Sequence, residues 1–163
     1  RSSFKYILDH TFFRPRDLLL FFQPLAQHNY DFPLSKYSIN QLIGKYCTEV
    51  VNELKNEFSC FYSINQIAMI FNAFMEMNDN LSHHNISSIP YEKAIEIIDN
   101  HCKDVDAKIL IEDMFYRSLI GNMKDNGHVF FKHREPSNDT YKFNKSYGII
   151  MHNALKVYCK SLS

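Results

Sequence analysis

The chain has 163 residues, of which 45% are hydrophobic and 22% are charged. This balance is typical of a folded globular protein and excludes an intrinsically disordered one. The longest apolar runs, such as residues 18–22, are far shorter than the roughly 20 residues that cross a bilayer. No signal peptide is expected at Arg1. We therefore predict a cytoplasmic protein with no membrane partner.

The formal net charge is zero, but the charges are segregated along the sequence. Residues 1–45 carry a net charge of +3, residues 46–116 carry −8, and residues 117–163 carry +5. An acidic middle and a basic end are suited to different partners. The simpler alternative is that the two regions screen each other within one fold.

Four cysteines lie far apart in the sequence, with no C-x-x-C pair: Cys47, Cys60, Cys102 and Cys159. Three of them fall at apolar helical positions, which is typical of free, partly buried thiols. We therefore predict neither a disulfide nor a metal site.

The first motif covers residues 10–22, HTFFRPRDLLLFF. Pro15 suits the first turn of a helix, and Asp17 favours the same turn through the helix dipole. Pro24 is a point where this helix would kink or end early. Arg14 and Arg16 stand at a helix start, where the dipole disfavours cations, so we expect negative charge nearby.

Two further helices are predicted over residues 38–58 and 63–78. Each begins with serine three residues before glutamine, a spacing that indicates a capping box at both Ser38 and Ser63. The first also carries a row of glutamates that is expected to face solvent, at Glu49, Glu53 and Glu57. Residues 29–37 and 78–88 are predicted loops, the second with exposed His83 and His84.

The C-terminal half predicts a helix, a β-wing and another helix. Pro90 opens a helix that the polar run at 99–101 ends, and a helix over 105–119 follows, capped by Gly121. Asn126-Gly127 is a strong hairpin signal, so strands are predicted at 120–124, 128–133 and 147–151, with a short one at 86–89 and a last helix at 152–161. The predicted fold is mainly α, with a helical region over 1–60 and a second domain over 61–163.

Four stretches carry a resemblance to a known family: FFRPRDLLLFF, LIGN, HVFFKHR and IIMHNALKVY. They resemble the lid helix and the C-terminal winged-helix region of bacterial P-loop ATPases of the STAND and AAA-like class. The resemblance implies a helical lid packed on a winged helix with a small antiparallel wing. It also implies that Arg14 and Arg16 sense nucleotide phosphates in the parent protein.

The nucleotide-binding core of such an ATPase is not present in this chain, because no G-x-x-x-x-G-K-[ST] motif occurs and glycine is found only at positions 44, 121, 127 and 148. ATP is therefore expected as a cofactor of the parent only, and no cofactor is expected here. In the isolated chain the two arginines would pair with acidic side chains, such as the glutamate row.

The predicted function is regulatory and non-catalytic, coupling the nucleotide state of an ATPase core to a protein partner or to self-association. No nucleophile elbow or H-E-x-x-H motif occurs, and His152 is expected to pack structurally. The alternative is a DNA-binding regulator that uses a basic wing of Lys124, Lys132, Arg134, Lys142 and Lys145. The helix over 105–119 argues against it, because its acidic residues would repel phosphates.

Overall fold

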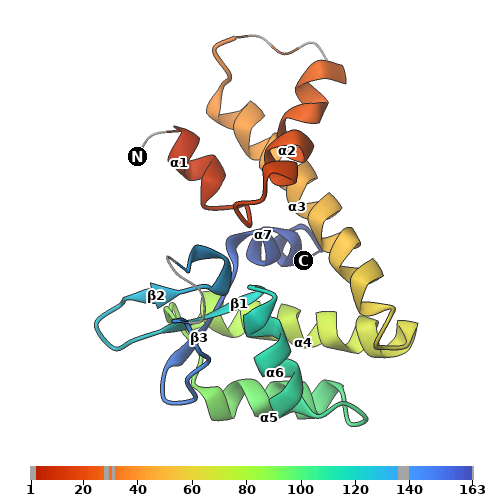
Figure 1. Ribbon diagram of the computed structural model, residues 1–163, viewed down its shortest axis with the longest axis vertical. Coiled ribbons are helices and arrows are strands. Elements are labelled where there is room, and N and C mark those ends of the chain that lie inside the picture. The colour runs from red at the N-terminus through yellow and green to blue at the C-terminus, as the bar shows by residue number, and fades with distance from the viewer. Residues whose placement is uncertain (1–2, 28–29, 31, 136–139, 163) are drawn as a thin grey trace. The chain divides into compact units, whose positions relative to one another are not determined.

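A computed structural model describes residues 3–27, 30, 32–135 and 140–162 of the chain. These residues form a mainly α structure with seven α-helices and a small three-stranded antiparallel sheet near the C-terminus (Figure 1). None of the described helices is long and apolar enough to cross a membrane. The chain divides into two compact units, residues 1–56 with 153–163 (unit 1) and residues 57–152 (unit 2).

Unit 1 is helical throughout its described residues. Its elements are α1 (Ser3–Leu8), α2 (Pro15–Gln27), α3 (Lys36–Phe58), whose last two residues belong to unit 2, and α7 (Asn153–Leu162). Helix α1 was not predicted. Helix α2 begins at Pro15 as expected and continues through Pro24, so Pro24 does not end it. The core of this unit contains fully buried Phe21, Leu42 and Tyr46.

The predicted capping box at Ser38 is wrong. Helix α3 begins at Lys36, two residues earlier, because the hydroxyl of Ser35 accepts a hydrogen bond from the Ser38 N–H at 3.0 Å. Two serines three residues apart competed for one cap, and the upstream one occupies it. The second prediction is confirmed, since Ser63 and Gln66 form a capping box at the start of α4.

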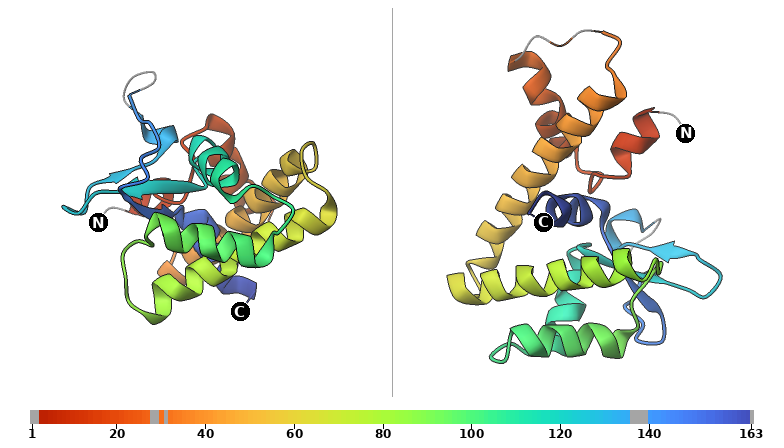
Figure 2. Two further views of the ribbon diagram at one scale, coloured as in Figure 1. Left: turned by 90° about the horizontal axis from the view of Figure 1, so that it is seen from below. Right: turned by 180° about the vertical axis from the view of Figure 1, so that it is seen from behind.

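Unit 2 contains three helices followed by the sheet. Its elements are α4 (Ile64–His83), α5 (Tyr91–His101), α6 (Ala107–Tyr116), β1 (Ile120–Met123), β2 (Val129–Phe130), a 3₁₀ turn (Lys132–Arg134) and β3 (Gly148–Met151). Helix α4 packs against α5, α5 against α6, and both α5 and α6 contact the sheet. Figure 2 shows these helices and the sheet from two further sides.

Two helices extend beyond their predicted ends. Helix α4 continues to His83 instead of ending near Asn78, because Leu81 is buried and extends the apolar stripe by one turn. Helix α5 includes residues 99–101, and His101 is held there by Glu76, whose carboxylate lies 2.7 Å from the imidazole. His83 and His84 are exposed, as predicted.

The sheet has the order β2-β1-β3, and both pairs are antiparallel. Ile89 adds an isolated bridge to Ile149 on β3, where the two backbones exchange hydrogen bonds of 2.8 and 2.7 Å. The strand predicted at 86–89 is therefore reduced to one bridge. The second predicted strand is also shorter than expected, because residues 132–134 form the 3₁₀ turn.

The hairpin predicted at Asn126-Gly127 is confirmed. The Gly127 N–H donates to the Lys124 carbonyl at 2.8 Å, and Gly127 has a φ of +79°. This backbone pattern is a three-residue hairpin loop with glycine in the left-handed position. The side chain of Asn126 accepts a hydrogen bond from the His128 N–H at 3.0 Å.

Gly121 does not cap α6, contrary to the prediction. The cap is formed by Ser118, which has a φ of +63°, and by a hydrogen bond of 2.9 Å from the Leu119 N–H to the Met114 carbonyl. Gly121 lies within β1, where an added Cβ would stand 2.5 Å from the Phe130 carbonyl oxygen. Its role is to allow close approach of β2.

All four cysteines are free thiols, as predicted; Cys47, Cys102 and Cys159 are buried and Cys60 is exposed. Burial raises the pKa of the Cys47 thiol to about 12. These thiols therefore pack as small apolar side chains.

Candidate functional site

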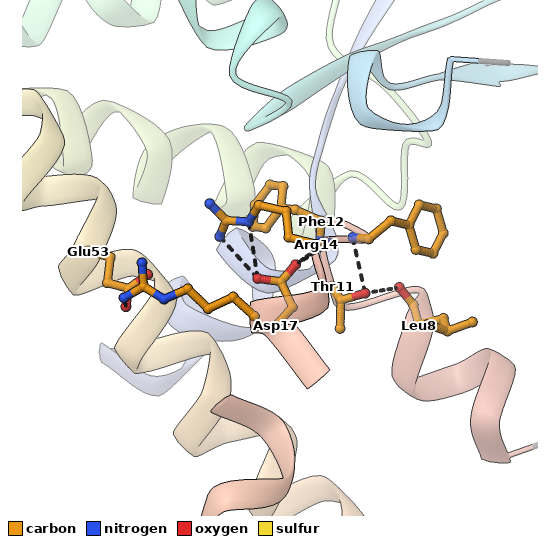
Figure 3. Close-up of polar contacts among 8 residues, drawn as sticks. Leu8, Thr11, Phe12, Arg14, Asp17 and Glu53 are labelled. Atoms are coloured by element: carbon orange, nitrogen blue, oxygen red, sulfur yellow. Dashed lines mark hydrogen bonds and ion pairs between the residues drawn. The ribbon is translucent and has the colours of Figure 1, made fainter. Parts of the chain in front are cut away.

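Asp17 organises the turn between α1 and α2 (Figure 3). Its carboxylate is completely buried, and one oxygen accepts hydrogen bonds from the Phe12 N–H at 2.8 Å and the Arg14 N–H at 3.2 Å. An acidic side chain in the first turn of a helix commonly caps the preceding N–H groups. Asp17 thus fixes the backbone that enters α2.

The side chain of Arg14 is held by the other oxygen of the same carboxylate. Its Nε and Nη2 lie 3.2 and 3.1 Å from Oδ1 of Asp17, and its guanidinium carbon lies 5.5 Å from the centre of the Phe12 ring. The side chain nevertheless stays 42% exposed. A buried carboxylate and an aromatic ring therefore orient a cation that solvent still reaches (Figure 3).

Phe13 lies at the apex of this turn with a strained backbone. Its φ is +57°, a value that bulky residues rarely adopt. The hydroxyl of Thr11 accepts a hydrogen bond from the Phe13 N–H at 3.4 Å and donates one to the Leu8 carbonyl at 3.0 Å. Phe13 is 45% exposed, so the strained turn leaves an aromatic residue open to solvent.

Arg16 forms an ion pair with Glu53 on α3. The arginine side chain is 65% exposed and that of Glu53 is 25% exposed. Both predicted arginines are therefore paired with acids, and Arg16 takes a member of the glutamate row. These pairs also supply the negative charge expected at the start of α2.

The phenol of Tyr46 is buried close to this turn. Burial, and after it the nearby Asp17 carboxylate, raise the pKa of Tyr46 well above its ordinary value. The phenol beside Asp17 therefore stays neutral.

The second candidate site is the predicted basic wing, where Lys132 and Arg134 are largely engaged within the chain. Lys132 lies 2.6 Å from the Glu135 carboxylate and donates to the Tyr141 carbonyl at 3.2 Å. The hydrogen bond from Lys132 is the main reason that the pKa of Glu135 falls to about 2. Arg134 lies 5.5 Å from the centre of the Phe131 ring and donates to His133.

Of the other three predicted cations, Lys145 and Lys142 are exposed and Lys124 is half-buried. Lys124 lies 5.1 Å from the centre of the Phe130 ring and 5.5 Å from that of Tyr147. Lys145 lies 5.6 Å from the centre of the Tyr91 ring and 3.9 Å from the Glu112 carboxylate. Lys142 is exposed.

Lys124 and Lys145 both line a cleft of about 380 Å³ at the start of α5. Asp125 and Glu92 line the same cleft, so the two cations face two carboxylates. The structure thus brings two of the predicted wing residues together in a cleft whose side-chain charges balance.

The outward face of α6 is apolar and acidic. Ile109 is 65% exposed and Tyr116 is 52% exposed, and exposed Glu112 lies between them on the same face. Asp113, next to it, pairs with Arg117 at 2.8 Å. The face therefore exposes two large apolar side chains beside carboxylates that are paired with Lys145 and Arg117.

His152 is completely buried, and its ring centre lies 5.4 Å from that of Phe131 and 5.1 Å from that of His133. It packs against the wing, as the sequence predicted. Within the described parts of the chain, no group of three or more His, Cys, Asp or Glu side chains is arranged to hold a metal ion.

Sequence reasoning placed Arg14 and Arg16 at this helix start but missed Asp17 as the residue that holds Arg14. It also missed the pairing of Glu135 with Lys132. The signal was present in both cases, because each acid stands three residues after its cation.

No family model matches the chain, and neither the curated proteins nor the solved structures contain a match.

Proposed function

We propose that this chain is a non-catalytic interaction module that works with a P-loop ATPase core. In this proposal, residues 1–60 are a helical lid and residues 61–163 are a winged-helix domain, which comprises residues 61–152 of unit 2 and helix α7 of unit 1. The module couples the nucleotide state of the core to a protein partner or to self-association. The core and its ATP belong to the parent protein, and Arg14 is the residue that contacts the nucleotide.

The order of elements in unit 2 supports the winged-helix assignment. Helices α5 and α6 follow α4 and are joined by a short turn, and the antiparallel strands come directly after α6. A helix-turn-helix followed by a β-wing has this order. The bridge from Ile89 to β3 adds the short strand segment that precedes the second helix of the motif.

The observation that carries the nucleotide part of the proposal is the pose of Arg14. A guanidinium that senses phosphate must be oriented in advance and must remain accessible. Asp17 and Phe12 orient Arg14, and 42% of its side chain stays exposed. A phosphate that reaches the exposed edge would compete with Asp17 and shift the turn.

The surface of α6 supports a protein partner over DNA. A recognition helix that reads the major groove approaches phosphates closely, and α6 presents Glu112 between exposed Ile109 and Tyr116. Burying these two side chains against a protein would be favourable at about 25 cal/mol for each Å² removed from water.

The experiment begins with the coding sequence upstream of Arg1, which we expect to encode a G-x-x-x-x-G-K-[ST] motif. ATP affinity of the full native polypeptide is then measured by isothermal titration calorimetry. Arg14→Ala should weaken ATP binding by at least about tenfold, as expected for loss of a charge-assisted contact. The control Lys36→Ala changes an exposed cation on α3 and should leave the affinity unchanged. Absence of the motif, or equal effects of the two variants, would refute the ATPase part.

DNA binding through the wing is the second candidate, and the exposure of Lys142 and Lys145 favours it. Fluorescence anisotropy with labelled duplexes at several salt concentrations tests it directly. Tight binding with sequence preference would indicate that the module binds DNA and not a protein partner. The double variant Lys142→Ala/Lys145→Ala should then lose this binding. We expect only weak, salt-sensitive binding without sequence preference.

A further inference from the structure

Opposite ends of unit 2 carry opposite charge. Residues 95–116 hold six carboxylates and two lysines, a formal charge of −4, whereas residues 117–152 hold six Lys or Arg and three Asp or Glu, a charge of +3. The turn between α5 and α6 lies at one end of the unit, and the wing hairpin lies at the other (Figures 1 and 2).

The acidic end is hollowed and partly apolar. A cleft of about 440 Å³ opens between the end of α5 and the start of α6. Half-buried Ile95 and Val105 form its apolar lining. Its charged lining is exposed and carries one more aspartate than lysine: Asp99, Asp104 and Asp106 against Lys103 and Lys108. Exposed Ile109 follows on α6.

The basic end presents lysines to solvent. Lys142 is exposed, and the side chain of Lys145 is 57% exposed. Lys145 contacts Glu112 in the middle of α6 at 3.9 Å, and its ammonium lies over the Tyr91 ring at the start of α5. The wing therefore lies beside the start of α5, away from the aspartates at its far end.

Glu112 and Asp113 pair with Lys145 and Arg117, but the aspartates at the far end of α5 are too distant from the wing lysines to be neutralised by them. Helix α5 has 11 residues and is about 16 Å long at a rise of 1.5 Å per residue. This length is roughly twice the Debye length of about 8 Å at physiological ionic strength. Each end thus keeps its own local field.

We propose that unit 2 associates head-to-tail with a second copy of this chain, with the acidic α5–α6 turn of one copy against the basic wing of the next. A second copy is the occupant that the charges favour, because it supplies the complementary surface and the chain as a whole has zero net charge. Two copies therefore approach without long-range repulsion. Contacts of this kind are heterologous and build chains or rings.

The inference rests on the proposed interaction role and names its partner. Sedimentation velocity of the full chain should show association that weakens at least about tenfold between about 50 and 500 mM NaCl. Two variants separate the surfaces. In the turn variant, Asp99→Lys and Asp104→Lys make both ends basic, and in the wing variant, Lys142→Glu and Lys145→Glu make both ends acidic.

Each variant alone should stay monomeric, and an equimolar mixture should associate again, because each basic end then meets an acidic one. Asp79→Lys, a charge reversal at an exposed position on α4, is the control and should associate like the unmodified chain.

If a double variant fails to fold, the single variants Asp104→Lys and Lys142→Glu are mixed instead. A chain that stays monomeric at low salt, or a mixture that does not associate, overturns the inference. An ATP affinity that still depends on Arg14 would then leave the proposed function in place.

Discussion

The turn before α2 and the basic wing both carry cations that the sequence marked as contact residues, but the two regions hold them differently. Arg14 is tied to a completely buried carboxylate in a strained turn. Lys124 and Lys145 lie over aromatic rings at the edge of an open cleft. The first arrangement fixes one geometry at a cost in backbone strain, whereas the second leaves charge available to salt and to partners.

The largest expected effect comes from removing the buried carboxylate. Asp17→Asn takes the counter-charge from Arg14 and weakens the cap on two backbone N–H groups. Because Arg14 stays partly exposed, the cost is that of losing hydrogen bonds to a charged group, typically about 1.5–3 kcal/mol. Urea denaturation should report a loss of this size, and Asp125→Asn, an exposed wing position, should change stability by less than about 0.5 kcal/mol. Equal effects would show that the turn is no more constrained than the wing.

The wing has its own rigid point, at Gly121. Gly121→Ala would place Cβ 2.5 Å from the Phe130 carbonyl oxygen, and overpacking of this kind costs about 1–3 kcal/mol. Gly44→Ala is the matched control, because nothing lies within 4 Å of its added Cβ inside α3. Alanine there should stabilise the chain by about 0.5–1 kcal/mol. Thermal denaturation of the two variants should give shifts of opposite sign.

Local chemistry explains what the sequence predicted well. The capping box at Ser63 and the hairpin at residues 126–127 depend on side chains within a few residues, and both were found. The capping box predicted at Ser38 is wrong because Ser35 caps the helix instead. The helix cap predicted at Gly121 is wrong because glycine is common both at helix ends and where strands approach closely. Only the fold shows that the second reason applies to Gly121.

Tertiary contacts decided the remaining differences. Helix α4 runs through the polar segment after Asn78 because Leu81 finds a buried position, which no local propensity reveals. The candidate cations could be named from the sequence, and their role as contact residues stays a prediction. Their engagement by Asp17, Glu135 and several aromatic rings depended on the folded turn and wing, and so did the exposure of Ile109 and Tyr116 on α6.

A smaller effect concerns pH and the wing. The pKa of Glu135 falls from 4.5 to about 2 in the folded chain, mainly through the hydrogen bond from Lys132. A depressed carboxyl pKa contributes stability that is present above the unfolded value and is lost as the pH falls toward the folded one. Denaturation between pH 5 and 2 should therefore show a loss that Glu135→Gln removes. An unchanged pH profile in that variant would assign the loss to other carboxyls.

The most direct measurement is a pair of double-mutant cycles on unfolding free energy. One cycle combines Arg14→Met with Asp17→Asn, and the other combines Lys145→Met with Glu112→Gln. We predict a coupling of at least about 1 kcal/mol in the first, reflecting its buried carboxylate, and less than about 0.5 kcal/mol in the second, whose partners are both about half exposed. A first coupling no larger than the second would contradict the claim that Asp17 holds Arg14 in position.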